Sequence, residues 1–133
     1  MKRMSPEEAV KNLGIRSGKL CPCPQDMKNC VCSDHKDSFA IEPFEGDSRD
    51  TWDKLIRLVS GISGYKLETQ KDDYAHFSFT SGIMKFVDDI EFRLENKGSK
   101  ILIHCRSASR LGYWDIGANR KRINKIFGLL KTT

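Results

Sequence analysis

The sequence lacks a long apolar segment and several widespread catalytic motifs. No apolar run approaches the roughly 20 residues that a membrane-spanning helix needs. Lys2 and Arg3 make the N-terminus basic, but no apolar segment follows them, so we predict no secretory signal and expect a cytoplasmic protein. A phosphate-binding glycine loop, a nucleophile elbow and an HExxH element are also missing, so none of these motifs identifies an enzyme.

The composition is that of a soluble globular protein with a basic C-terminal part. The chain has 133 residues, of which 38% are hydrophobic and 31% charged, and this length suits one domain with its own core. The formal net charge is +5. Against the single acid Asp115, residues 106–131 hold seven basic residues: Arg106, Arg110, Arg120, Lys121, Arg122, Lys125 and Lys131. This excess favours an anionic partner, whereas basic residues without aromatic stacking platforms are weak support for nucleic-acid binding.

The hydrophobic periodicity predicts an α+β fold. Helices are expected from the capping box at 5–8 and from an apolar stripe at Trp52, Leu55, Ile56, Val59 and Ile62. Strands are expected at 39–41, 65–70, 75–81, 86–95 and 101–110. Because short links favour an antiparallel meander, we predict about five strands with two long helices, the second at 115–131, packed on one face. The other face should be open to water or ligand, and it bears His76, Ser78, Thr80, Glu91, His104 and Arg106.

The domain organisation is expected to be simple. We predict a single domain over residues 1–133, in which 1–38 form a short N-terminal helix and a cysteine-rich loop and 39–133 form the α+β core. The N-terminal helix is too short to be stable alone. It must therefore dock on the core or serve as an adaptable arm.

Asp88 is a carboxylate where the pattern of its strand predicts an apolar side chain. It shares a strand face with Ile90, so its carboxylate needs hydrogen-bond donors or a place at the rim of the sheet. If the turn of the hairpin is residues 96–99, Asp88 lies opposite Ser107, and the hydroxyls of Ser107 and Ser109 are the nearest donors. Two interpretations stay open: a rim carboxylate that holds the strand end, or one that binds a ligand or does chemistry.

Asn119 is a polar residue on the apolar stripe of the last helix. Asp115 is a candidate N-cap of that helix. The stripe itself consists of Ile116, Ile123, Ile126, Phe127 and Leu130. An amide in this position either bonds the neighbouring backbone or contacts a ligand.

These polar residues predict a connected network. In the register above, Asp89 pairs with Arg106 on the outer face of the sheet. The network should join the strand at 86–94 to the helix at 115–131, through a corner that Gly112 bends with a positive φ. Its first role would be to place these elements relative to one another, and a ligand site would use the arginines it exposes.

The C-terminal half also resembles the uncharacterised protein family DUF1499. The matching residues are Phe86, Asp88, Asp89, Glu91, Phe92, Arg106, Ser107, Ser109, Arg110, Gly112, Asp115, Gly117, Asn119, Arg120 and Arg122. Upstream, Cys23-Pro24 and Asn29-Cys30-Val31 resemble the Cys-Pro and Asn-Cys-Val elements of the family. The likeness covers roughly residues 20–130. It implies a shared fold and a cluster of important positions but no activity, because none is established for the family.

Four cysteines lie close together in the N-terminal loop, with the spacing C-x-C-x6-C-x-C: Cys21, Cys23, Cys30 and Cys32. Three states stay open: one Zn²⁺ held by four thiolates, a Cys23–Cys30 disulfide alone or beside Cys21–Cys32, and free thiols. The resemblance covers only the Cys23 and Cys30 pair, so the two additional cysteines favour zinc. A reducing cytosol disfavours a disulfide. Zinc is the only cofactor that the sequence suggests.

The candidate site supports three kinds of function. Its proposed ligand-binding residues are Asp88, Asp89, Arg106, Ser107, Ser109, Arg110, Asp115, Asn119 and Arg120. The favoured function is a non-enzymatic module for an anionic small molecule or partner at a corner formed by the three arginines of this set, because arginine suits bidentate recognition of carboxylate or phosphate. The alternatives are an enzyme that uses Asp88 with one of the two serines, and a structural or protein-interaction domain.

Overall fold

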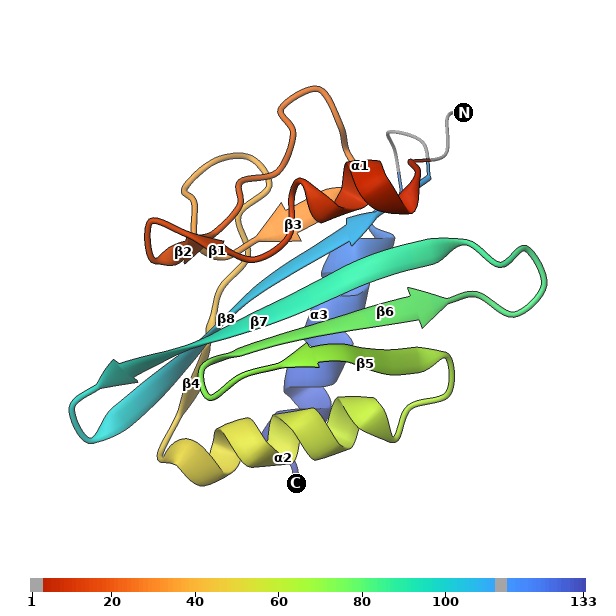
Figure 1. Ribbon diagram of the computed structural model, residues 1–133. Coiled ribbons are helices and arrows are strands. Elements are labelled where there is room, and N and C mark those ends of the chain that lie inside the picture. The colour runs from red at the N-terminus through yellow and green to blue at the C-terminus, as the bar shows by residue number, and fades with distance from the viewer. Residues whose placement is uncertain (1–3, 112–114) are drawn as a thin grey trace.

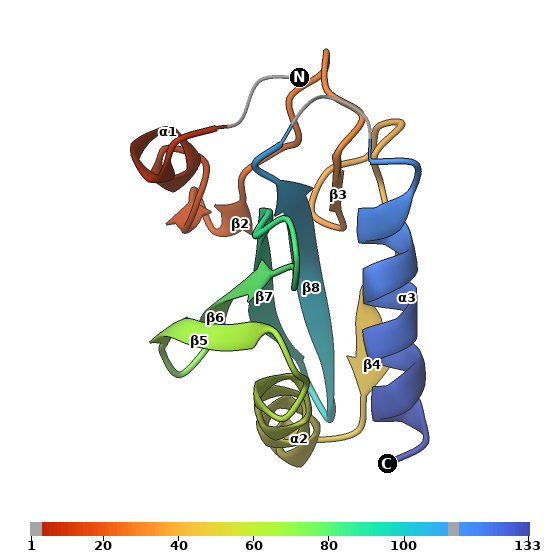
Figure 2. The same cartoon turned by 90° about the vertical axis from the view of Figure 1, so that its right-hand side faces the viewer.

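The computed structural model describes residues 4–111 and 115–133 and shows an α+β fold built on an antiparallel sheet (Figure 1). The helices are α1 (Pro6–Val10), α2 (Arg49–Ser60) and α3 (Ala118–Lys131). The strands are β1 (Ile15–Arg16), β2 (Lys19–Leu20), β3 (Cys30–Cys32), β4 (Phe44–Gly46), β5 (Tyr65–Gln70), β6 (Tyr74–Thr80), β7 (Val87–Lys97) and β8 (Lys100–Ser109). Figure 2 shows α3 along one face of the sheet and α1 with the β1–β2 hairpin along the other.

The main sheet contains the predicted meander and two further short strands. Strands β5 to β8 follow one another antiparallel, in the sheet order β3-β8-β7-β6-β5. β3 and β4 both pair with the outer edge of β8, one after the other along its length. The described residues hold eight strands, so the predicted number of about five is too low. The four additional strands have only two or three residues, which is too short to show a period of two in the sequence.

The strand predicted at 39–41 is wrong. Only Ala40 in that segment forms a bridge, with Cys32. The nearest strand is β4, which begins after Pro43 and pairs with β8. Proline has no backbone N–H to donate to a sheet. The proline therefore marks where this strand can begin and does not end an earlier one.

The register of the β7–β8 hairpin also differs from the prediction. Lys97 pairs with Lys100, so the turn consists of two residues, Gly98 and Ser99, and not of four. Gly98 has a φ of 66°, the left-handed conformation that two-residue hairpin turns require. Asp88 consequently lies opposite Ser109. The predicted and observed registers differ by an even number of residues. The predicted assignment of side chains to the two faces of the sheet therefore remains correct.

The hydrophobic core lies between the sheet and the two long helices. Trp52, Leu55, Ile56 and Val59 of α2 are buried, as the apolar stripe predicts. They share one cluster with Ile123, Ile126 and Leu130 of α3 and with the apolar face of the sheet, including Phe77, Ile90, Phe92 and Ile103. The prediction of two long helices packed on one face is therefore confirmed. Neither helix, nor any other in the described part of the chain, is long and apolar enough to cross a membrane.

The N-terminal segment covers the face of the sheet that the sequence predicts to be open. Ser5 caps α1 by accepting a hydrogen bond from the backbone N–H of Glu8 (3.2 Å), as expected. The segment after α1 lies on this side of the sheet (Figure 2), where the N–H of Gly14 contacts Glu91 of β7 and the carbonyl of Cys21 contacts Arg106 of β8. Five of the six residues predicted to be accessible are buried instead: His76, Ser78, Glu91, His104 and Arg106. This expectation was wrong because a short helix and an irregular loop show no periodic pattern that reveals where they dock.

Candidate functional site

The β7–β8 ladder separates the candidate site residues onto two faces of the sheet. Successive side chains of a strand point in opposite directions. Asp88, Ser107 and Ser109 therefore face α3, together with Asp115 and Asn119. Asp89, Arg106 and Arg110 face the N-terminal segment. Arg120 belongs to neither group, because it is exposed on the outer side of α3. The corner predicted from Arg106, Arg110 and Arg120 is therefore not formed.

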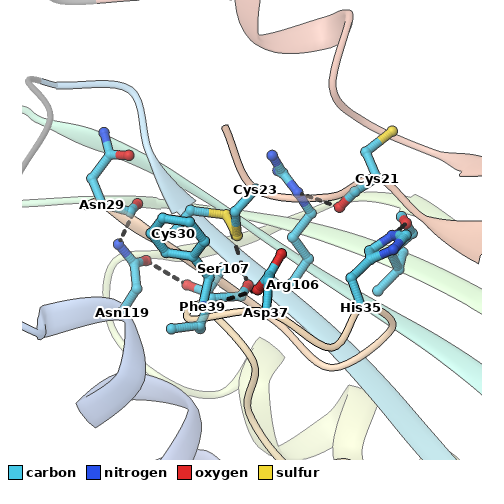
Figure 3. The surroundings of a disulfide bond; sticks show 12 residues. Cys21, Cys23, Asn29, Cys30, His35, Asp37, Phe39, Arg106, Ser107 and Asn119 are labelled. Carbon is cyan, nitrogen blue, oxygen red and sulfur yellow. Dashed lines mark hydrogen bonds between the residues drawn. A yellow bond between two sulfur atoms is a disulfide. The ribbon is translucent and has the colours of Figure 1, made fainter. Parts of the chain in front are cut away.

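On the helix side, the buried amide of Asn119 is the centre of a hydrogen-bond network. Its Oδ1 accepts from Ser107 Oγ (2.6 Å) and Arg122 Nη1 (2.7 Å). Its Nδ2 donates to the backbone O of Asn29 (3.0 Å) (Figure 3). The same nitrogen donates to Asp115 Oδ2 (2.7 Å). One side chain of α3 thus joins β8 to the residue that precedes β3 and to the segment that leads into the helix. The predicted network is confirmed on this face of the sheet.

The position of Asp88 explains why a carboxylate is tolerated on this face. Its Oδ2 forms an ion pair with Arg122, whose guanidinium also lies over the ring of Phe79 at 5.1 Å. Ser107 donates its proton to Asn119 and not to Asp88. Arg122 also donates to Ser107 Oγ (3.1 Å), so one guanidinium joins the serine hydroxyl and the carboxylate of Asp88. Sequence reasoning missed Arg122 as a partner, although its place three residues after Asn119 indicates the same side of the helix.

Asp115 caps the last helix, but three residues ahead of its start. Its Oδ1 accepts from the N–H of Gly117 (2.8 Å) and its Oδ2 from the N–H of Asn119 (3.0 Å). Gly117 occupies the N-cap position itself, with a φ of 79°. The prediction of Asp115 as the N-cap residue is therefore wrong in position, although its carboxylate accepts N–H groups at the start of the helix. The positive φ predicted for Gly112 lies outside the described residues.

We expect Asn119→Ala to lower the free energy of unfolding by about 1–3 kcal/mol, because Ser107, Arg122 and the Asn29 carbonyl lose a buried partner. Urea denaturation followed by circular dichroism measures this change. Asn124→Ala, an exposed position of the same helix, is the control and should change stability by less than about 0.5 kcal/mol. Equal stabilities for the two variants would contradict the structural role of the network.

On the opposite face, Glu91 is a completely buried carboxylate. Its Oε2 accepts hydrogen bonds from Tyr74 Oη (2.5 Å) and the N–H of Gly14 (2.7 Å). Its Oε1 lies 3.8 Å from Arg106 Nη1 and has no hydrogen-bond partner among the described residues. Burial raises the pKa of Glu91, and the opposing hydrogen bonds and the charge of Arg106 reduce this effect without cancelling it.

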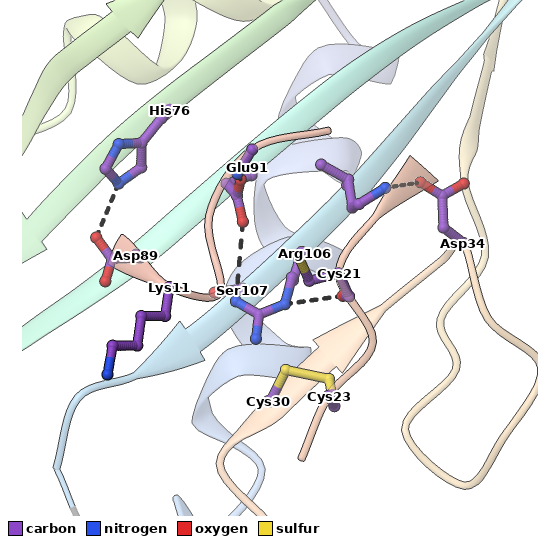
Figure 4. Close-up of polar contacts among 12 residues, drawn as sticks. Lys11, Cys21, Cys23, Cys30, Asp34, His76, Asp89, Glu91, Arg106 and Ser107 are labelled. Atoms are coloured by element: carbon purple, nitrogen blue, oxygen red, sulfur yellow. Dashed lines mark hydrogen bonds and ion pairs between the residues drawn. A yellow bond between two sulfur atoms is a disulfide. The ribbon is translucent and has the colours of Figure 1, made fainter. Parts of the chain in front are cut away.

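Arg106 links the N-terminal segment to the sheet. Its Nε donates to the backbone O of Cys21 (3.0 Å), while its Nη1 faces Glu91 (Figure 4). The predicted pairing of Arg106 with Asp89 is wrong, because the two-residue turn places Glu91 opposite Arg106. Since Arg106 is buried and already paired, it is not available to a ligand in this structure.

Asp89 pairs with the second arginine of this face. Arg110 approaches it with Nε (2.7 Å) and Nη2 (2.9 Å), and His76 Nε2 lies 2.8 Å from its Oδ1. Burial alone would raise the pKa of Asp89, but the hydrogen bonds from His76 and Arg110 outweigh it and lower the pKa. The cavity beside Arg106 and Arg110 measures about 30 Å³, which is room for little more than one water molecule.

A third charged cluster was not predicted from the sequence. Arg93 contacts Asp34 through Nε (3.0 Å) and Nη2 (2.5 Å), and His104 lies between two carboxylates. Its Nδ1 is 3.1 Å from Asp34 Oδ1 and its Nε2 is 2.7 Å from Glu95 Oε1. Burial would raise the pKa of Asp34, but the bonds from Arg93 and from the backbone N–H of Leu20 lower it overall. Asp34 lies in an irregular loop 59 residues from Arg93, so no spacing rule connects them.

This cluster also places a serine next to a histidine. Ser33 Oγ lies 3.2 Å from His104 Nδ1 and accepts the backbone N–H of Cys105 (2.8 Å). The same ring nitrogen lies 3.1 Å from Asp34 Oδ1. The cluster therefore holds the loop around Asp34 against the sheet.

The clustered cysteines contain one disulfide. Cys23 and Cys30 are bonded, whereas Cys21 and Cys32 are buried free thiols (Figure 3). The disulfide uses two of the four sulfurs, so the structure corrects the zinc alternative with four thiolate ligands. Within the described ranges no group of three or more His, Cys, Asp or Glu side chains could hold a metal ion. Burial also raises the pKa of Cys32 to about 11, which disfavours the thiolate form that binds metals.

A protein with this disulfide should show three titratable thiols per chain after denaturation without reductant, and five after reduction. Replacing Cys23 and Cys30 with serine should lower stability by about 2–3 kcal/mol, the chain-entropy value for so short a loop. Dithiothreitol should destabilise the wild type similarly and leave the double variant unchanged. Five thiols before reduction would contradict the disulfide. The cytoplasmic location stays a prediction, which this count also tests, because a reducing compartment would favour five.

A cleft of about 330 Å³ lies beside two of the candidate residues, between the disulfide loop and the start of α3. Its walls are formed by Gln25, Lys28, Cys30, Val31, Ser38, Phe39, Asp115, Gly117 and Arg120. Lys28 and Arg120 are exposed and form no ion pair with any described residue. Both oxygens of Asp115 are occupied by backbone N–H groups of the helix start. Two of the predicted site residues, Asp115 and Arg120, therefore border an accessible site.

The comparisons with known proteins agree with the resemblance noted in the sequence. No curated protein and no solved structure matches the chain. The family model described as "Protein of unknown function (DUF1499)" matches residues 19–130. This range includes the disulfide loop, the whole meander and nearly all of α3. The chain therefore belongs to the DUF1499 family.

Proposed function

We propose that the protein is a small binding domain that holds an anionic group in the cleft between the disulfide loop and α3, at Lys28 and Arg120. The observation that carries the proposal is the distribution of paired and unpaired charge. Three of the seven basic residues in 106–131 are paired with acids of β7: Arg106 with Glu91, Arg110 with Asp89 and Arg122 with Asp88. The other four, Arg120, Lys121, Lys125 and Lys131, lie on α3 and form no ion pair with a described residue. The basic excess that predicts an anionic partner is thus concentrated on this helix.

The chemistry of the cleft suits a small anion. The guanidinium of Arg120 can donate two parallel hydrogen bonds to a carboxylate or phosphate, and Lys28 supplies a second positive charge. Ser38 and Gln25 add neutral polar groups, and Phe39 provides an apolar wall. The positive end of the α3 dipole points toward the same region. A volume of about 330 Å³ is near the lower end for small-molecule pockets, which favours a small ligand over an extended one.

The test is a calorimetric titration with inorganic phosphate and with acetate. We expect saturable binding of at least one of them, weakened about tenfold or more in Arg120→Gln, because a charged hydrogen-bond donor is lost. Lys131→Gln, in the last turn of the same helix and outside the cleft, is the matched control and should bind as the wild type does. An unchanged affinity in Arg120→Gln, or no binding of either anion, would overturn the proposal.

A further inference from the structure

We propose that the end of the molecule beside this cleft docks on an anionic membrane surface, so that the anion held by Lys28 and Arg120 is a lipid headgroup. The identity of the anion rests on the proposed function. The membrane contact itself rests on a different feature, the exposed apolar side chains of two neighbouring segments.

The first observation is the location of those side chains. Ile83 is 94% exposed and Met84 61% exposed in the loop between β6 and β7, and Ile116 is 69% exposed just before α3. A single exposed apolar side chain is ordinary, whereas a group of them indicates an interaction. The N–H of Arg110 donates to the carbonyl of Val87 (3.0 Å), so the end of β8 lies beside the start of β7, where the loop ends. Figures 1 and 2 show both segments at the same end of the sheet.

The second observation is the backbone of the same two segments. Lys85 has a φ of 55° and Ile116 a φ of 56°, and among the described residues only Ser17 shares this conformation outside glycine. The left-handed region is costly for a β-branched residue such as isoleucine. Ile116 recovers little of this cost by packing, because its side chain is mostly in solvent. Backbone strain that the packing of the side chain does not offset points to a contact of this residue with another molecule.

The third observation is the charge next to each apolar segment. Lys85 directly follows Met84 in the loop. Arg120 follows Ile116 by four residues, in the first turn of α3. The carbonyl of Lys28 accepts the N–H of Asp115 (3.1 Å), which places this lysine beside the same segment. Proteins that bind at the surface of a membrane usually insert apolar side chains at the edge of the acyl chains. Their basic side chains contact the phosphates of the lipid headgroups. The protruding loop fits a deformable bilayer better than it fits a rigid groove.

The test is co-sedimentation with vesicles of phosphatidylcholine, with and without phosphatidylglycerol. We expect binding only to the vesicles that contain phosphatidylglycerol, weakened by added salt. Ile83→Ser and Ile116→Ser should each lower the partition coefficient about tenfold, since each removes one apolar side chain from the contact. Leu129→Ser is the matched control, because Leu129 is 40% exposed at the other end of α3, and it should bind as the wild type does.

The phosphate titration separates this inference from the proposed function. Ile83→Ser should bind free phosphate normally while losing vesicle binding, whereas Arg120→Gln should weaken both. If phosphate binds but vesicles do not, or if vesicles bind equally without phosphatidylglycerol or after both isoleucine replacements, the membrane contact is wrong and the anion site stands. If vesicle binding depends on Ile83 but free phosphate does not bind, the anion site is wrong. If the wild type does not bind vesicles but forms dimers, and Ile83→Ser abolishes the dimers, the surface binds a second copy of the chain.

Discussion

Replacing Arg106 with leucine is expected to lower the free energy of unfolding by about 3–5 kcal/mol at neutral pH, the usual cost of removing one partner of a buried ion pair. The loss leaves the carboxylate of Glu91 buried without its neighbouring charge, and it also removes the hydrogen bond to the carbonyl of Cys21. Both effects act on the contact between the N-terminal segment and the sheet. Urea denaturation at several pH values measures them.

The pH dependence identifies Glu91 as the cause. Burial raises the pKa of Glu91 above its ordinary value of 4.5, so the folded state binds this proton more tightly than the unfolded chain does. The associated stability is present below the ordinary pKa and is lost as pH rises through the folded value. The free energy of unfolding of Arg106→Leu should therefore be closest to that of the wild type at acidic pH. The difference between the two should grow as the pH increases. Arg120→Leu, an exposed arginine, should change stability by less than about 0.5 kcal/mol, and an equal loss there would contradict the assignment.

Trp52→Ala should cost a similar amount, about 3–5 kcal/mol, for a different reason. Trp52 is 1% exposed and belongs to the cluster that joins α2 to the sheet and to α3. Removing the indole leaves a cavity that the surrounding side chains fill only in part. Thermal or urea unfolding measures the loss, and Trp52→Phe, which retains an aromatic ring, should lose clearly less. A silent Trp52→Ala would mean that α2 does not pack on the core.

Long periodic elements could be predicted from the sequence because their pattern depends on local geometry. The stripe that contains Trp52 and the alternation of β5 to β8 each extend over enough residues to distinguish a helix from a strand. The coverage of the polar face could not be predicted in this way. It depends on contacts such as that between Gly14 and Glu91, which are 77 residues apart in the chain, and the segment that makes them has no repeating pattern.

The candidate site was predictable where a residue type conflicted with its position. Asn119 and Asp88 are polar residues on apolar faces. A buried polar group needs a partner within the protein, and each of the two has one: Ser107 for Asn119 and Arg122 for Asp88. The predicted corner of three arginines was wrong because a run of basic residues does not indicate which acidic residues pair with them. One signal was present: Asp89 and Glu91 lie on one face of their strand, and Arg106 and Arg110 lie on the same face along the facing segment, which indicates that these charges neutralise each other.

The location of the anion site is the central claim of this account. Its most direct test is an NMR titration of the isotopically labelled protein with inorganic phosphate, following the backbone amides. We predict that the changes concentrate at Lys28, Ser38 and the helix start at 117–120, the residues that border the cleft. Changes centred on Arg106 and Arg110, or no saturable change at any amide, would contradict it.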